Sequence, residues 1–107
     1  MEHLLVKDYD VLNGNNQFVY PIAIDHIKSV SIQIIWRDLV SIYDSSVEMI
    51  QSNNGVDFDT MDLMAVMSSE NGSVTLADVS FPSQFLALKF SKNNCSGGKM
   101  TAILVTK

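Results

Sequence analysis

The side chains best suited to chemistry in this sequence are the carboxylates of Asp57, Asp59 and Asp62, which follow two asparagines and a glycine. Carboxylate and amide oxygens are good ligands for a hard cation such as Ca²⁺. The run, however, lacks the Asp-x-Asp-x-Asp-Gly order with a closing glutamate that calcium loops use. Asp57 and Asp59 flank Phe58 instead, as the outward residues of a strand flank an inward aromatic. We therefore expect a turn followed by a strand, and no metal site.

The imidazoles and the single thiol provide no catalytic group either. His26 follows Asp25, but adjacent side chains of an extended chain point to opposite faces, so the pair is poorly placed for acid–base catalysis. Cys95 lies in a loop-like Asn-Asn-Cys-Ser-Gly-Gly segment, and His3 is the only other imidazole in the chain. One cysteine cannot form an intrachain disulfide, and no spacing matches a zinc site. We expect no catalytic residue, no cofactor and no enzymatic activity.

Aromatic side chains that could stack on a sugar leave a binding hypothesis open. The candidates for such a platform are Trp36, Tyr43 and Tyr9. Trp36 ends the apolar row of a strand-like run, where a tryptophan most often closes one end of a hydrophobic core. We therefore favour a core position for Trp36 and retain the platform as the alternative, to be decided by the burial of this side chain.

The composition indicates one folded domain and excludes some partners. Of 107 residues, 47% are hydrophobic and 18% charged, so we expect a single domain spanning 1–107. The formal net charge is −5 and the seven basic residues are scattered, which argues against a nucleic-acid partner. No apolar run approaches the roughly 20 residues that cross a bilayer, and no signal peptide is visible, so we expect no membrane partner.

Alternating hydrophobicity predicts an all-β fold. Residues 30–36 place Val30, Ile32, Ile34 and Trp36 on one face and polar residues mainly on the other, which is the period of a strand with one buried side. Clusters of Gly, Asn and Ser separate seven or eight such runs. These clusters lie at 13–16, 52–55, 71–73 and 93–98. We predict an antiparallel β-sandwich of jelly-roll or immunoglobulin-like type.

Individual strands are predicted with different precision. We expect strands over 4–12, 17–25, 47–51, 74–79, 84–90 and 100–105, and we leave 38–46 unassigned. Pro21 has no N–H to donate, so its strand should lie at a sheet margin. The spacing of Met61, Met64 and Met67 leaves 63–67 open between a strand and one helical turn. The strands at 84–90 and 100–105 are apolar on both faces, which predicts central positions, covered on both sides or placed against a neighbouring subunit.

Four stretches of the sequence together resemble small β-sandwich proteins encoded among the virion genes of tailed phages. These stretches are 29–36, 47–58, 85–90 and 97–107. The most specific parts are the Ser-Asn-Asn-Gly-Val-Asp-Phe turn that starts at Ser52 and the Thr-Ala-Ile-Leu-Val-Thr-Lys ending at Lys107. The family more often has Asp and Trp where this chain has Asn54 and Phe58, and it offers no counterpart for residues 1–28.

The resemblance is greatest to auxiliary capsid or head-decoration proteins, including those of crAss-like phages. It implies a non-enzymatic structural protein on the capsid surface of the virion, made in the host cytoplasm, whose partner is the major capsid protein or another virion protein. Self-association is a further expectation, because we expect the apolar strands at 85–90 and 100–105 to leave edges for a partner or a second copy. The same turn occurs in carbohydrate-binding sandwiches, so a carbohydrate-binding or adhesion module is the alternative.

Overall fold

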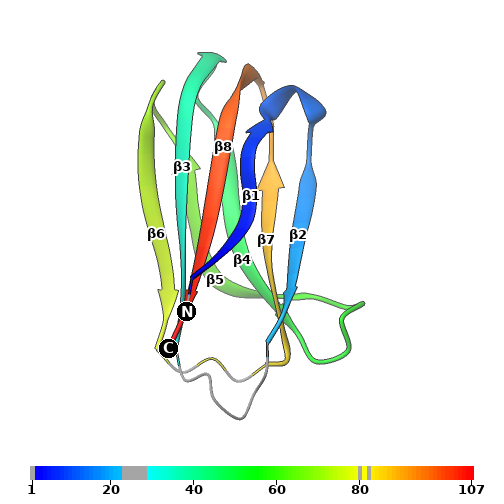
Figure 1. The fold of residues 1–107 in the computed structure, drawn as a ribbon. Helices are drawn as coiled ribbons and strands as arrows, with labels where there is room; N and C mark the ends of the chain where they lie inside the picture. Colours follow the sequence, from blue (N-terminus) through cyan, green and yellow to red (C-terminus); the bar gives the residue numbers. More distant parts are fainter. Residues whose placement is uncertain (1, 23–28, 80, 82) are drawn as a thin grey trace.

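The computed structural model describes residues 2–22, 29–79, 81 and 83–107, and it shows two antiparallel four-stranded sheets packed face to face (Figure 1). Sheet I has the order β1 (Glu2–Asp10), β8 (Cys95–Thr106), β3 (Val30–Ser41) and β6 (Gly72–Asp78). Sheet II has the order β2 (Asn16–Pro21), β7 (Phe85–Ser91), β4 (Ser45–Ser52) and β5 (Asp59–Met67). One 3-10 turn, η1 (Val11–Asn13), connects β1 to β2.

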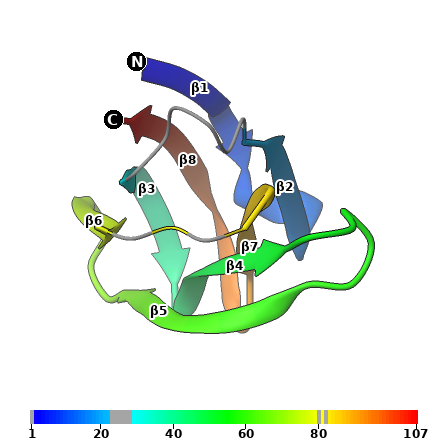
Figure 2. The same ribbon diagram turned by 90° about the horizontal axis from the view of Figure 1, so that it is seen from below.

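The strand order is that of a jelly roll. Successive strands pass between the two layers except for β4 and β5, which pair within sheet II, and the resulting orders 1-8-3-6 and 2-7-4-5 form the two Greek keys of an eight-stranded jelly roll. Figure 2 shows the two layers end on. The predicted all-β sandwich is confirmed, and of the two predicted types the jelly roll is the one formed. The described residues include no helix long and apolar enough to span a membrane.

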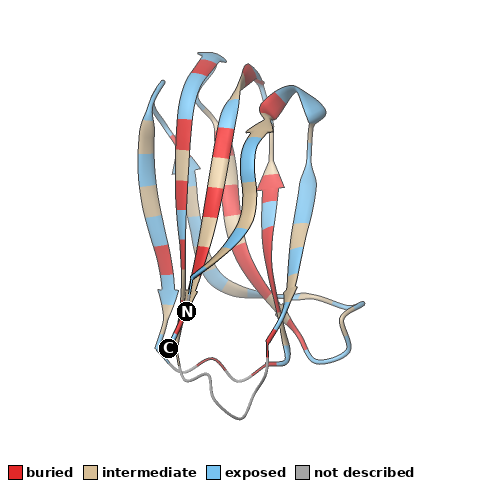
Figure 3. Cartoon of the chain, viewed as in Figure 1, coloured by how far each residue is buried: buried red, intermediate tan, exposed pale blue. Residues whose placement is uncertain are grey.

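The inward row of β3 forms the centre of the core, as predicted. Val30, Ile32 and Ile34 are buried, and Trp36 is 5% exposed with its indole Nε1 donating to the Ser69 carbonyl at 3.0 Å. Figure 3 shows the alternation along β3 as bands of buried and more exposed residues. Facing them across the sandwich are buried residues of sheet II, namely Val47, Met49, Leu86, Leu88 and Phe90.

The strand does not end at Trp36. A register shift against β8 between Arg37 and Val40, with Asp38 at φ 59°, adds an irregularity after which Leu39 returns to the core. The segment 38–46, left unassigned from the sequence, is therefore the end of β3, a short turn and the start of β4. The bulge breaks the alternation of inward and outward residues, so the strand could not be recognised in 38–46.

The methionine spacing at 61–67 does not mark a helical turn. The whole of 59–67 is the strand β5, and Met67 is buried whereas Met64 is 58% exposed. A bulge in β5, with Asp62 at φ 57°, shifts the pairing with β4 between Met49 and Ile50. Residues 61–67 alternate regularly, with Met61 and Met67 on the inward side and Met64 on the outward side, so the three-residue spacing of the methionines reflects no helical period.

The edges of the two sheets differ from the prediction. The strands at 85–90 and 100–105 are β7 and β8, and each has a paired neighbour on both sides. Their predicted central positions are confirmed, but the expectation that they leave free edges is wrong. The edge strands are β1 and β6 in sheet I and β2 and β5 in sheet II. Pro21 lies on edge strand β2, as its missing N–H predicted.

Gly72 allows the indole of Trp36 to pack against the backbone of β6, which gives a prediction about stability. A Cβ at Gly72 would lie 2.6 Å from Cζ2 of Trp36. We expect Gly72→Ala to lower the free energy of unfolding by about 1–3 kcal/mol, because the buried indole must shift. Gly97→Ala is the matched control, since its nearest contact would be an ordinary 3.5 Å to Val40. Urea unfolding of both variants measures the difference, and equal stabilities would contradict it.

Candidate binding surfaces

The acidic run after β4 is a turn held by its own side chains. Oγ of Ser52 accepts hydrogen bonds from the backbone N–H groups of Asn54 and Gly55, at 3.2 and 2.9 Å. Oδ1 of Asn54 accepts from the N–H groups of Val56 and Asp57, both at 2.9 Å, and Nδ2 of Asn54 donates to Oδ2 of Asp57 at 3.0 Å. The polar oxygens thus satisfy the backbone of the turn.

The expected turn is present and a strand follows it, since β5 begins at Asp59. The expected inward position of Phe58 is wrong, because Phe58 precedes β5 and lines a hollow on the outer face of sheet II. Within the ranges that the structure describes, no group of three or more His, Cys, Asp or Glu residues is arranged to hold a metal ion. The absence of a metal requirement stays a prediction.

The thiol and the described imidazole occupy separate structural positions. Cys95 is buried, and its Sγ lies 3.3 Å from the Gly97 carbonyl and 3.4 Å from that of Val40. His3 is on β1, where its Nδ1 lies 2.8 Å from the hydroxyl of Tyr20. Because His3 pairs with Leu104 near the other end of β8, it cannot activate Cys95. The Asp25–His26 pair lies outside the described residues.

The three aromatic candidates do not form a sugar platform. Trp36 is buried, and Tyr9 packs edge-on against Phe18 and Phe90, with its hydroxyl donating to the Gly14 carbonyl at 2.9 Å. Only Tyr43 is exposed, at 40%. The burial of Trp36 therefore removes the platform suggested by the sequence.

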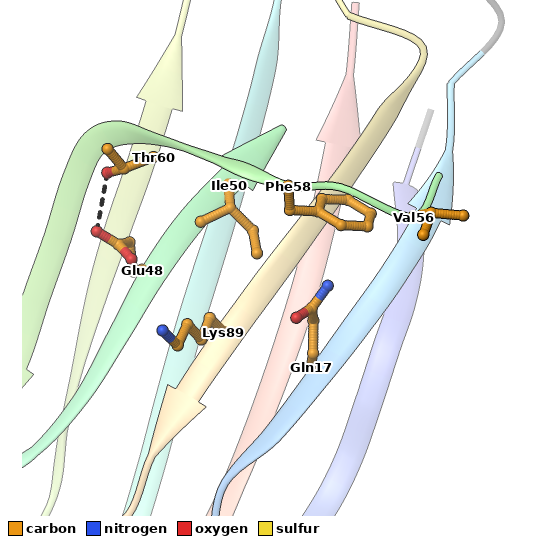
Figure 4. A pocket seen from close by; sticks show the side chains of 7 residues that line it. All are labelled: Gln17, Glu48, Ile50, Val56, Phe58, Thr60 and Lys89. Carbon is orange, nitrogen blue, oxygen red and sulfur yellow. Dashed lines mark hydrogen bonds between the residues drawn. The ribbon is translucent and has the colours of Figure 1, made fainter. Parts of the chain in front are cut away.

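A groove lies on the outer face of sheet II, where residues 53–58 fold back across the strands. Gly55 sits directly over the ring of Phe85, because an added Cβ would lie 3.1 Å from Cζ of Phe85. Beside this contact is a hollow of about 350 Å³ (Figure 4). It is lined by Gln17, Glu48, Ile50, Val56, Phe58, Thr60 and Lys89. A second hollow, of about 240 Å³, shares Gln17 and Lys89 with it and extends towards Asn15.

The groove combines polar groups with one aromatic ring. Glu48, Lys89 and Gln17 lie in one cross-strand row, because Lys89 pairs with both of the others. Oε2 of Glu48 accepts from Oγ1 of Thr60 at 2.9 Å, and Figure 4 shows Phe58 on the opposite side of the hollow from Lys89. Such a groove offers donors, acceptors and an apolar wall, which suits binding of a polar ligand.

The groove could not be predicted from the sequence. Its lining residues come from β2, β4, β7, the start of β5 and the segment before it, so they meet only through the strand order. The alternation in each predicted strand indicated which residues face outward. It does not show which residues of other strands lie beside them.

The outer face of sheet I has a different character. Register places Leu4 beside Ile103, Ile103 beside Gln33, and Gln33 beside Thr75 in one row across the sheet. Ile35 and Val105 lie in the neighbouring rows. We call this surface the uncharged face; it consists of Leu4, Ser31, Gln33, Ile35, Ser73, Thr75, Ala77, Thr101, Ile103 and Val105.

The uncharged face carries a strip of apolar side chains that no described segment covers. Figure 1 looks onto this face, and the described strands in front are those of sheet I itself. Leu4 is 58% exposed, and Ile35, Ile103 and Val105 are partly exposed. The strand at 100–105 is apolar on both faces, and it was predicted either to be covered on both sides or to lie against a neighbouring subunit. The described residues do not cover its outer side. Placement against a neighbouring subunit stays a prediction.

Comparison with known proteins identifies a fold and no family. No family model and no curated protein matches the chain. Among solved structures, a subunit of Bacillus endospore appendages, described as disulfide-linked pili, superposes with a TM-score of 0.55 at 8% identity over 97% of this chain and 83% of that one. A structure reported under "CBM4 structure and function" superposes with a TM-score of 0.53 at 10% identity over 85% of this chain.

The chain spans 61% of the length of the CBM4 structure. A chain of infectious bursal disease virus is more distant, with a TM-score of 0.45 at 15% identity over 99% of this chain and 31% of that one. At these identities the first two similarities show the β-sandwich fold alone.

The turn that forms one wall of the groove gives a second prediction. We expect Asn54→Ala to lower the free energy of unfolding by about 1–3 kcal/mol, because two backbone N–H groups lose their acceptor. Asn54→Asp should cost less, since it keeps the accepting oxygen and loses only the donor to Asp57. Thermal unfolding of both variants beside the exposed control Val56→Ala measures this. If Asn54→Ala proved as stable as the control, the turn would not depend on Asn54.

Proposed function

We propose that this protein is a non-enzymatic structural protein of a tailed-phage virion, an auxiliary or decoration protein attached to the major capsid protein on the outer capsid surface. The observation that carries the proposal is the uncharged face of sheet I. It combines partly exposed Leu4, Ile35, Ile103 and Val105 with neutral polar residues.

The uncharged face has the composition of the centre of a protein interface. The centres of protein interfaces are depleted of charged residues and rich in apolar contact, whereas their rims are polar. Here the charged residues lie at the margins of the sheet, with Glu2 beside Val105 at one end and Arg37 beside Lys99 at the other. Lys7 and Asp8 lie on the edge strand β1, where the Asp8 N–H donates to Oγ1 of Thr101. This composition supports contact with the surface of another folded protein. The net charge of −5 opposes binding to packaged DNA and is consistent with a position outside the capsid.

The identity of the partner comes from the sequence resemblance. That resemblance covers residues 29–107, which include β3 and β8, the two central strands of the uncharged face. The jelly-roll fold is compatible with this role, since virion proteins are among those that use it. The protein would then act in the host cytoplasm during assembly and on the virion surface afterwards.

A second candidate function is carbohydrate binding, and the groove on sheet II is the specific observation in its favour. Gln17, Glu48, Lys89 and Thr60 provide donors and acceptors for hydroxyl groups, and the ring of Phe58 provides an apolar wall. A sugar ring has both kinds of surface. This site replaces the Trp36, Tyr43 and Tyr9 platform that the sequence suggested.

Capsid binding tests the first proposal. We expect Leu4→Lys to weaken co-sedimentation with purified capsids by about tenfold or more, because a charge would be buried in an apolar contact. Met64→Lys is the matched control: Met64 is also 58% exposed and lies on edge strand β5 of the other sheet. Ile103→Lys, at the centre of the face, should abolish binding in protein that circular dichroism shows to be folded.

Two results would contradict the first proposal, one in part and one as a whole. Equal loss with Met64→Lys and Leu4→Lys would contradict the assignment of the face. Retention on DNA with no capsid binding at physiological salt would overturn the virion proposal altogether.

A glycan array tests the second candidate with separate variants. If the groove binds sugars, wild-type protein should bind glycans, and Phe58→Ala or Lys89→Ala should reduce that binding by about tenfold, whereas Leu4→Lys should not change it. Capsid binding by a protein that binds no glycan would leave the virion proposal standing and remove this candidate.

A further inference from the structure

The four edge strands are not equally protected against pairing with another chain. β1 is interrupted by two register shifts, with Asp8 at φ 51°, and β5 has the bulge at Asp62. β2 ends in Pro21. These are the devices by which natural sheets block their edges. β6 has none of them: its seven residues pair with β3 without a register shift, and it contains no proline, lysine or arginine.

The hydrogen-bond phase shows which backbone groups of β6 are free to pair. Ser29 and Lys107 exchange both backbone bonds at 3.0 Å, so odd-numbered residues of β3 bond to β8. Bonded pairs alternate along an antiparallel ladder, so even-numbered residues of β3, such as Ile34, bond to β6. Ile34 pairs with Val74, which makes the even residues of β6 the bonded ones. The residues whose N–H and C=O groups point away from β3 are therefore Ser73, Thr75 and Ala77.

The same rule accounts for β2. Ile22 donates its N–H to the Gln84 carbonyl at 2.7 Å, so even residues bond towards β7 and odd residues face the free edge. Pro21 is one of these odd residues, and its missing N–H lies at the edge. The sequence thus removes a donor from the edge of β2 and leaves the three donors of β6 in place.

We propose that β6 pairs with β6 of a second copy of this protein, antiparallel and centred on Thr75, to join two copies of sheet I into one continuous sheet. In this register Thr75 lies opposite Thr75, Ser73 opposite Ala77, and Val74 opposite Leu76. Each outward N–H and C=O of the three odd residues then has a partner. Figure 1 shows β6 at the margin of sheet I, with no described strand beyond it.

Charge and side-chain pairing favour a second copy over an unrelated strand. Threonine pairs and β-branched pairs across strands are favourable, and like charges directly opposite are not. The antiparallel arrangement places Asp78 of the second copy opposite Gly72, whose carbonyl accepts from Nη1 of Arg37 at 3.2 Å. Each Asp78 therefore lies opposite a glycine, which carries no charge. A parallel arrangement would place Asp78 opposite Asp78.

The twofold arrangement is closed, so it gives a dimer and not a fibre. It also joins the two uncharged faces, because Ser73, Thr75 and Ala77 belong to that face. A strand pair of this length buries less than the roughly 1,200 Å² of a stable interface, so the free dimer should be weak. The inference does not depend on the capsid, and its test uses the protein alone.

Sedimentation velocity over about 10 µM to 1 mM tests the pairing. Wild-type protein should show a concentration-dependent dimer, and Thr75→Pro should stay monomeric, because it removes an outward N–H without touching the bonds to β3. Val19→Pro is the matched control: it removes an outward N–H from β2 and should dimerise like wild type. Thermal melts establish that both variants fold.

A covalent probe gives an independent readout. Thr75→Cys should form a disulfide-linked dimer under mild oxidation, because residue 75 faces itself across the twofold axis, whereas Val19→Cys should not. The native Cys95 is buried and does not interfere. A wild-type protein that stays monomeric at 1 mM, or a Thr75→Pro variant that dimerises as wild type does, would overturn the proposal.

Discussion

The position of β3 between β8 and β6 is the constraint on which the rest of the structure depends. Both neighbours pair with β3 in uninterrupted register from Val30 to Trp36, so one alternation is imposed on three strands together. A slip by one residue would move Trp36 and the isoleucines from the core to water. The same register places Ile35 beside Thr101 and Ser73, and Gln33 between Ile103 and Thr75, on the outer face. The core and the uncharged face are therefore two sides of one pairing.

The two outer faces of the sandwich differ because of what crosses them. On sheet II the segment after Ser52 folds back over Phe85 and leaves a groove with charged and amide groups. On sheet I the described residues place no segment over the face, and its outward positions are apolar or neutral. A groove with mixed polarity favours a small polar ligand, whereas a flat uncharged surface favours another protein. This contrast is why we propose attachment through sheet I and keep sugar binding by sheet II as the second candidate function.

The sequence was informative where one local period governs the structure. The inward row of β3, the edge position of Pro21 and the turn at Asn54 could all be predicted, because each depends on residues close in sequence. A bulge defeated the prediction at Leu39, since one extra residue reverses the phase without a compositional signal. At Met64 the strand period is intact, but the three-residue spacing of the methionines matched a helical period as well. The groove and the uncharged face were beyond reach, because strand order brings their residues together and pairing partners cannot be read from alternation.

The most direct test of the central claim is a reconstruction of the decorated capsid by electron cryomicroscopy. Our account predicts that sheet I faces the major capsid protein, with Ile103 and Ile35 buried in the contact and the groove of sheet II open to solvent. Density that seats sheet II on the capsid, or capsids that carry no copy of the protein when it is present in excess, would contradict the account.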